Sequence, residues 1–320
     1  MRTVWACFLC CLATGGVAVA SEVPRVECFP IERVEPALRA KADALLLETM
    51  DSPALYTVIG GLKPMTSSFL SSLSGTQAGA LTYAKSELQP GGAVLAKIDE
   101  LRRTMAVLRC GDDIQSAVLT EIDMSTGSAE RGAAEPFVFH VPAVRNVIAG
   151  FPGYFARLAI TPQTSPETML FTMHRIDASG PAPANLEARR EWMRATGFET
   201  IDQIRASGAL YGYARPAVEA FAESINRIAR GEKPPGPGID DARMIMRIPS
   251  FKGETNWYRK ATPEESPEDA ALRVKAGQIL AEYRTRREKY IGAGKPGVVA
   301  MLRDWFCARD QCSAANAQPK

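Results

Sequence analysis

The first twenty residues constrain the chain most, because they have the composition of a cleavable secretory signal peptide. Arg2 supplies the positive charge, and an apolar stretch follows from Val4 to Leu12. Ala18 and Ala20 are the small residues that signal peptidase requires ahead of the cleavage point at Ser21. We therefore expect a secreted or periplasmic protein whose mature chain begins at Ser21 and folds in an oxidising compartment.

The remainder of the chain carries neither a membrane span nor a strong net charge. No later stretch reaches the roughly 20 apolar residues that cross a bilayer. The apolar run of the signal is shorter and is interrupted by Gly15 and Gly16, so we favour cleavage over retention as an anchor or lipidation. The full chain has 38 Lys and Arg residues, of which Arg2 belongs to the signal, so 37 remain against 36 Asp and Glu. This balance argues against nucleic-acid binding by general electrostatic attraction.

Four of the seven cysteines lie beyond the signal, and an even number in an oxidising compartment predicts two disulfides. Three pairings are possible. The short separation of Cys307 and Cys312 favours a local bridge between them, which leaves Cys28 to pair with Cys110. A zinc site is the rival interpretation, but a Cys-x-x-Cys pair is missing and neither histidine is near these cysteines in sequence. We therefore expect no metal and no other cofactor.

Helical periodicity dominates the mature sequence and predicts a helix-dominated α+β fold. A capping side chain followed by proline marks several helix starts, as at Ser52-Pro53 and Ser266-Pro267. Helices are expected at residues 36–49, 53–60, 81–88, 93–108, 142–148, 167–176, 186–196, 201–206, 216–230, 266–291 and 297–306.

A small sheet is expected in the middle of the chain. Residues 115–123 carry three branched apolar side chains among polar ones, and residues 137–141 form a run of aromatic and β-branched residues ended by Pro142. The loop between them is rich in Gly, Ser and Ala, and we predict that the two segments pair antiparallel. A further short strand is predicted at 244–248.

A Pro- and Gly-rich connection at residues 232–239 is the best candidate for a domain boundary. It separates an α+β globular domain at 21–231 from a mainly helical region at 240–320, which we expect to pack on the first. The signal peptide occupies residues 1–20.

The chain has two histidines, His140 and His174, and either could act with Asp123 as an acid–base pair. Such a pair requires side chains that converge in the fold, and separate structural roles are the simpler interpretation. A Gly-x-Ser-x-Gly motif for a serine nucleophile is missing from the sequence.

Two pairs of aromatic residues are candidates for ligand binding. Trp257 and Tyr258 lie beside Arg259 in a polar stretch without helical or alternating apolar pattern, so we expect them on a ligand-facing surface. Tyr211 and Tyr213 form the second pair and precede a predicted helix. Aromatic faces beside a guanidinium suit sugar rings or peptide strands.

Lys63 is a candidate for holding an anion. It follows Gly60 and Gly61 and precedes Thr66 and Ser67, so backbone amides, an ammonium group and hydroxyls occur together. The residue order of a phosphate-binding loop is absent, and a helix stop followed by a turn is the simpler interpretation.

These features favour an exported protein with a binding or envelope-associated role and an unknown small-molecule, glycan or peptide ligand. The alternative is a hydrolase that acts on cell-envelope or extracellular material through a histidine–carboxylate site.

Overall fold

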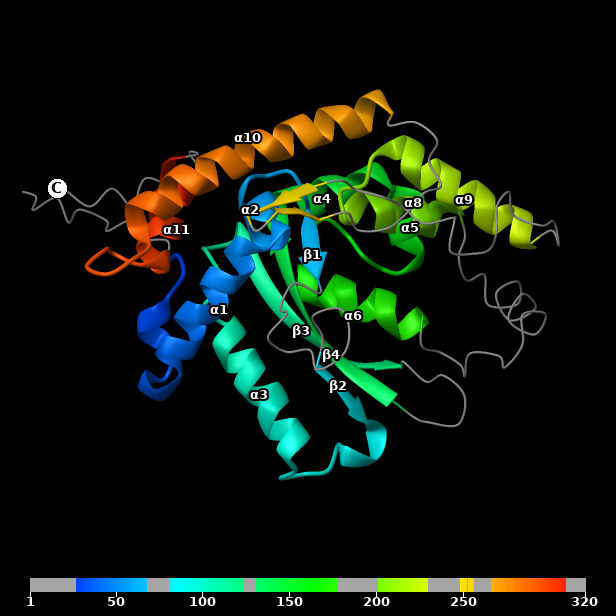
Figure 1. Cartoon of the computed structure of the whole chain (residues 1–320). Coiled ribbons are helices and arrows are strands. Elements are labelled where there is room, and N and C mark those ends of the chain that lie inside the picture. The colour runs from blue at the N-terminus through cyan, green and yellow to red at the C-terminus, as the bar shows by residue number, and fades with distance from the viewer. Residues whose placement is uncertain are drawn as a thin grey trace, which may run out of the picture.

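The computed structural model describes residues 27–67, 81–123, 131–177, 201–229, 248–251, 253–255 and 266–308. Within these ranges the protein is mostly helical and contains a four-stranded antiparallel sheet in mid-chain (Figure 1). This confirms the predicted helix-dominated α+β fold with a small sheet in the middle of the chain. The predicted helix at 186–196 and the predicted connection at 232–239 lie outside the described residues. No helix in the described ranges has the length and apolar character of a membrane span.

The helices that precede the longest strand pairing are η1 (Ile31–Arg33), η2 (Pro36–Leu38), α1 (Arg39–Asp51), α2 (Pro53–Ile59), η4 (Lys85–Glu87) and α3 (Ala93–Met105). Those that follow it are α4 (Val141–Gly150), α5 (Pro152–Arg157), α6 (Pro166–Asp177), α8 (Ile201–Leu210), α9 (Arg215–Ala229), α10 (Pro267–Tyr290) and α11 (Val298–Ala308). The strands are β1 (Met65–Ser67), β2 (Leu81–Ala84), β3 (Ile114–Asp123) and β4 (Arg131–His140), with β5 (Ile248–Ser250) and β6 (Gly253–Thr255) in a separate two-stranded sheet.

Strand β4 is the centre of the main sheet. One of its sides pairs antiparallel with β3, which confirms the predicted pairing of the two mid-chain segments. Its other side pairs first with β1, where Ser67 lies opposite Phe137, and then with β2, where Leu81 lies opposite Ala134. Glu135 therefore falls on β4 between the paired stretches of β1 and β2.

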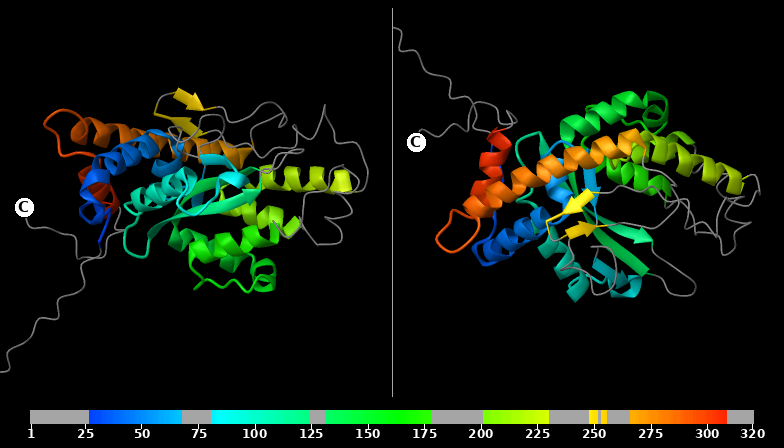
Figure 2. Two further views of the ribbon diagram at one scale, coloured as in Figure 1. Left: turned by 90° about the horizontal axis from the view of Figure 1, so that it is seen from below. Right: turned by 45° about the horizontal axis from the view of Figure 1, so that its top comes forward.

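Alternation along β4 divides the core into two layers. Ala134 and Val138 belong to a cluster with buried residues of α1, α2, α3, α10 and α11. Phe137 and Phe139 belong to a second cluster with residues of α4, α5, α6 and α8, and their rings stack at 6.2 Å. The sheet thus lies between two helical layers, which the views of Figure 2 show from two further sides.

The predicted helix at 81–88 is wrong, because residues 81–84 form β2 and only a 3-10 turn follows. Strand pairing with β4 outweighs the local helical pattern here. Tyr83 is buried against β4, and a Cβ at Gly132 would overlap its ring. The short helix α5 was not predicted, whereas α8 extends from the predicted start to Leu210.

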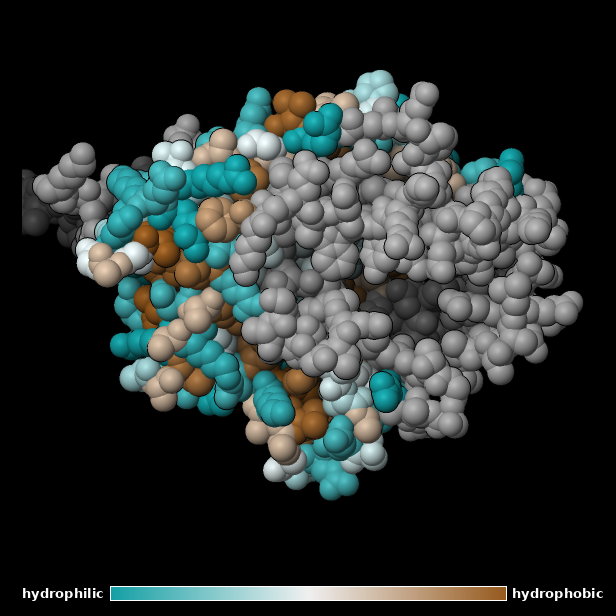
Figure 3. Space-filling model, in the orientation of Figure 1, coloured by the Kyte–Doolittle hydropathy of each residue, from teal (hydrophilic) through white to brown (hydrophobic). Residues whose placement is uncertain are grey.

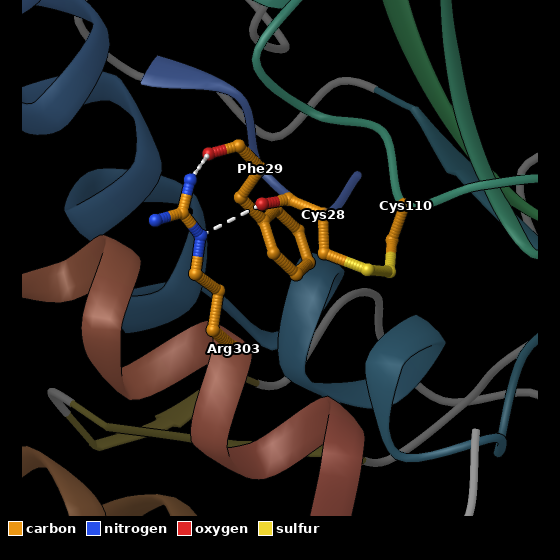
Figure 4. The surroundings of a disulfide bond; sticks show 4 residues. All are labelled: Cys28, Phe29, Cys110 and Arg303. Atoms are coloured by element: carbon orange, nitrogen blue, oxygen red, sulfur yellow. Dashed lines mark hydrogen bonds between the residues drawn. A yellow bond between two sulfur atoms is a disulfide. The ribbon is translucent and has the colours of Figure 1, made fainter. Parts of the chain in front are cut away.

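The N-terminal segment is fastened to the body by a disulfide between Cys28 and Cys110, as predicted (Figure 4). The neighbouring Phe29 donates its backbone N–H to the carbonyl of Arg109 at 2.7 Å. Arg303 of α11 donates to the carbonyls of Cys28 and Phe29 at 2.8 and 3.0 Å. Cys312 lies outside the described residues, so its bridge to Cys307 stays a prediction.

On the face seen in Figure 1, the visible described residues show hydrophilic side chains interspersed with hydrophobic ones (Figure 3). Among the described residues, Val274 of α10 is the large hydrophobic side chain that is clearly exposed. The apolar stripes of the other helices are directed into the two cores, except that Val218 and Ala222 of α9 form a smaller third cluster with Ile204 of α8.

Candidate functional site

Two segments that the sequence singles out, around Lys63 and around Tyr211, lie against each other. The hydroxyl of Tyr211 is 3.4 Å from Oγ of Ser67, although the two residues are 144 positions apart in sequence. We use the name Lys63–Tyr211 cluster for Lys63, Ser67, Glu135, Tyr211 and Tyr213.

Lys63 is positioned by the end of α2. The backbone N–H groups of Leu62 and Lys63 both donate to the carbonyl of Thr57, at 2.8 and 3.2 Å. These bonds close the last turn of the helix and satisfy one of its terminal carbonyls. The chain then enters β1, so Lys63 is placed between the end of a packed helix and the start of a paired strand.

The turn from α8 to α9 brings the two tyrosines to Lys63. Gly212 lies between them with a φ of +71°, a left-handed conformation that favours glycine. A Cβ at this position would lie 3.2 Å from Cγ and 3.3 Å from Cα of Lys63. The turn therefore needs glycine for its backbone conformation and for the close approach of the lysine.

Both tyrosines of the cluster keep their hydroxyl protons. Burial raises the pKa of Tyr211, and the nearby Glu135 carboxylate raises it further. Burial also raises the pKa of Tyr213, whose ring centroid is 6.5 Å from that of Tyr211. Each hydroxyl can therefore donate a hydrogen bond to a ligand at physiological pH.

Burial also disfavours the charged form of Lys63, which for a lysine means a lower pKa. The partly buried position lowers the pKa of the Lys63 ammonium from 10.5 to about 8. No hydrogen bond or ion pair joins this ammonium to another of the described residues. The arrangement can supply a positive charge and up to three N–H donors to a bound group.

Replacing Lys63 with Met should stabilise the ligand-free protein. Because the folded pKa of about 8 is below the unfolded value of 10.5, the unfolded chain binds more protons between these values. Wild-type stability should therefore rise with pH across this window, and the cost of burying the ammonium is complete below pH 8. Lys63→Met should raise the free energy of unfolding at pH 7 by about 1–3 kcal/mol.

Urea denaturation at pH 7 and at pH 9.5 measures this effect. Lys97→Met is the matched control, because Lys97 is exposed on α3 and should change stability by less than about 0.5 kcal/mol. A Lys63→Met protein no more stable than the wild type at pH 7 would show that burial of the ammonium is not costly.

His140 lies at the end of β4, where it caps α4. Its Nδ1 accepts a hydrogen bond from the backbone N–H of Ala143 at 3.3 Å. Burial lowers the pKa of His140, while the Asp113 carboxylate opposes this shift. Nδ1 can accept a hydrogen bond only in the neutral imidazole. Burial and the capping hydrogen bond therefore both favour the neutral form of His140.

The structure does not bring Asp123 to His140. Asp123 lies opposite Gly132, eight residues along β4 from His140, which is roughly 25 Å at 3.3 Å per residue. Asp113 is the carboxylate that acts on His140 instead, and burial raises the pKa of Asp113. His174 belongs to α6, and its side chain lies outside the described part of the structure.

A cap and a catalytic base respond differently to substitution of His140. His140→Ala should cost about 1 kcal/mol of stability, because it removes the acceptor for Ala143. His140→Asn should recover most of that loss, since asparagine is a good helix cap. Thermal unfolding of both variants checks this, and equal losses for Ala and Asn would contradict a capping role.

Three candidate ligand residues, Trp257, Tyr258 and Arg259, lie outside the described residues, so their ligand-facing position stays a prediction. Glu135 was missed by the sequence analysis. The signal was present, because Glu135 alternates with Phe137 and Phe139 and therefore shares their face of β4.

No group of three or more His, Cys, Asp or Glu residues in the described ranges is arranged to hold a metal ion. Comparison of the chain with protein-family models, with curated proteins and with solved structures found no match.

Proposed function

We propose that the protein is an exported binding protein that holds a small polar ligand at the Lys63–Tyr211 cluster without covalent chemistry. Export is proposed from the signal-like N-terminus, and the Cys28–Cys110 disulfide is consistent with an oxidising compartment. The same two features support the proposed secreted or periplasmic location.

The observation that carries this proposal is the convergence of Lys63 with the tyrosine turn. Tyr211 reaches Ser67 on β1, and Gly212 packs against Lys63. Polar groups from segments far apart in sequence are thus held by elements that the two cores fix in place. Binding residues are often found on turns that a rigid scaffold positions in this way.

The groups of the cluster suit a ligand with both polar and ring-like parts. Lys63 donates hydrogen bonds, Ser67 and Tyr211 both donate and accept, and Glu135 accepts. The two tyrosines add aromatic faces, which pack well against sugar or aromatic rings. Small molecules, glycans and peptides all contain such combinations.

A ligand-detected NMR screen tests the proposal, with a panel of neutral sugars, sugar acids, aromatic acids and short peptides. We expect binding that Tyr211→Phe weakens at least about tenfold, because only the hydroxyl is removed. Tyr290→Phe is the control, since Tyr290 belongs to the other core. Binding that Tyr211→Phe leaves unchanged would place the ligand elsewhere and contradict the proposal.

Hydrolysis through His140 is the second candidate, and it is favoured by the Asp113 carboxylate that acts on this imidazole. Release of soluble fragments from cell-wall material measures it. A hydrolase should lose this release in His140→Asn while keeping its stability, whereas a binding protein releases no fragments in either form.

A further inference from the structure

We propose that the ligand of the Lys63–Tyr211 cluster is a monocarboxylic acid that carries a ring, with its carboxylate paired to the ammonium of Lys63. This inference rests on the proposed binding function and adds the chemical class of the ligand.

Other partly buried cations have carboxylate partners. Arg287 lies 2.8 Å from Asp51, and Arg205 lies 2.7 Å from Glu219. The Lys63 ammonium makes no such pair with the described residues, and the stem of the side chain lies against Gly212. A charge taken out of water without a partner is costly, and a ligand anion removes that cost.

The surroundings favour an anion with a single negative charge. The described cluster offers one cation, and the Glu135 carboxylate is near enough to raise the pKa of Tyr211. A second negative charge on the ligand would therefore meet repulsion without a second cation to balance it. A carboxylate fits this balance better than a phosphate dianion.

The neighbouring helix N-terminus does not provide an extra anion site. Helix α9 starts directly after the tyrosine turn, and its first N–H, that of Arg215, donates to Glu268 at 3.1 Å. Glu268 also pairs with the Arg215 guanidinium at 3.6 Å. A carboxylate of the protein already occupies this helix end, which leaves Lys63 as the cation for the ligand.

The ring of the ligand is inferred from the two tyrosines. Tyr211 and Tyr213 flank Gly212, which lies against the stem of Lys63, and their rings are tilted with centroids 6.5 Å apart. Burial raises the pKa of both hydroxyls, so both stay protonated. Aromatic faces next to hydroxyl donors suit a sugar ring or an aromatic ring that bears the carboxylate. Sugar acids and aromatic acids both combine a ring with a single carboxylate.

Matched acid and amide pairs test the inference. The probes are glucuronate with glucuronamide and benzoate with benzamide, which differ in charge at nearly constant shape. NMR-detected titration of the wild type should show that at least one acid binds about tenfold or more tightly than its amide. Comparison of the two pairs distinguishes a sugar acid from an aromatic acid.

The variants assign the preference to Lys63. Lys63→Met should remove the preference for acid over amide, Lys63→Arg should keep part of it, and Lys97→Met should leave it unchanged. Thermal unfolding of each variant shows that it is folded. An acid preference that survives in Lys63→Met would overturn the inference.

Failure of this inference can be told from failure of the proposed function. If acid and amide bind the wild type equally, and Tyr211→Phe weakens both, the binding site stands and the acid class is wrong. If neither member of either pair binds the wild type, the acid class is overturned. The binding function then stands only if another ligand of the NMR screen binds and Tyr211→Phe weakens that binding.

Discussion

Replacing both Cys28 and Cys110 with alanine should lower the free energy of unfolding by about 2–5 kcal/mol. The disulfide joins residues 82 positions apart, and a bridge that closes a long loop restricts the unfolded chain strongly. Both cysteines are also buried, so the variant loses packing as well as the covalent bond.

The same bridge supports contacts that depend on the N-terminal segment. Phe29 is fully buried, and its ring meets Phe306 edge-on at 6.4 Å between centroids. Arg303 donates to the carbonyls of Cys28 and Phe29 in the same segment (Figure 4). It also donates to the Glu32 carboxylate at 2.9 Å. Loss of the disulfide should therefore loosen α11 together with the segment.

Urea denaturation with and without a reductant measures this prediction. The wild type should lose stability when reduced, while the double variant should change little, because its remaining predicted bridge, Cys307–Cys312, closes a short loop. A double variant within about 0.5 kcal/mol of the oxidised wild type would contradict the structural role of the bridge.

Asp51→Ala should lower the free energy of unfolding by about 3 kcal/mol, because the Asp51 carboxylate accepts hydrogen bonds from two residues of α10. Asp51 accepts from the Tyr283 hydroxyl at 2.5 Å, and from Nε and Nη2 of Arg287 at 2.8 and 3.1 Å. Tyr283 is fully buried and stacks on Tyr56 and on Trp305. The variant leaves a buried hydroxyl and a partly buried guanidinium without their acceptor.

Asp99→Ala is the matched control for Asp51→Ala. Asp99 pairs with Arg102 at 3.3 Å on the surface of α3, so its loss should cost less than about 1 kcal/mol. Chemical denaturation of both variants decides the comparison. Equal losses for the two variants would show that the Asp51 network does not stabilise the contact between α1 and α10.

Much of the fold was predictable because its signals are local. A serine followed by proline predicts the start of α10. The Ser266 hydroxyl accepts a hydrogen bond from the backbone N–H of Asp269, as an N-cap does. The antiparallel pairing of β3 and β4 follows from two β-rich runs joined by one loop. The Cys28–Cys110 bridge was predictable from an even cysteine count and from the short sequence separation of the other two cysteines.

The errors arise where distant segments decide the outcome. Residues 81–84 have a weak helical pattern. They form a strand because they pair with residues 131–134 along the edge of β4 that faces away from β3. The partner of His140 follows from the direction of the pairing, because β3 and β4 are antiparallel and joined by one loop. Asp123 therefore lies at the loop end of the pair, whereas Ile114, next to Asp113, lies opposite His140. Asp113 rather than Asp123 therefore acts on the histidine.

In the candidate site, too, local features were predictable from the sequence and contacts between distant segments were not. Lys63, Tyr211 and Tyr213 were predictable as residue types suited to ligands, each in its own segment. Their meeting was not predictable, because it requires β1 to join the edge of β4 and the α8–α9 turn to pack against the end of α2. Tertiary packing, rather than any motif, assembles the cluster.

A crystal structure with the most tightly bound acid tests the proposed site most directly. We predict a carboxylate oxygen within about 4 Å of Lys63 Nζ, the usual limit for an ion pair, and a ligand ring in contact with Tyr211. A ligand bound away from Lys63 and Tyr211, or bound identically in Lys63→Met, would contradict the assignment of this cluster as the binding site.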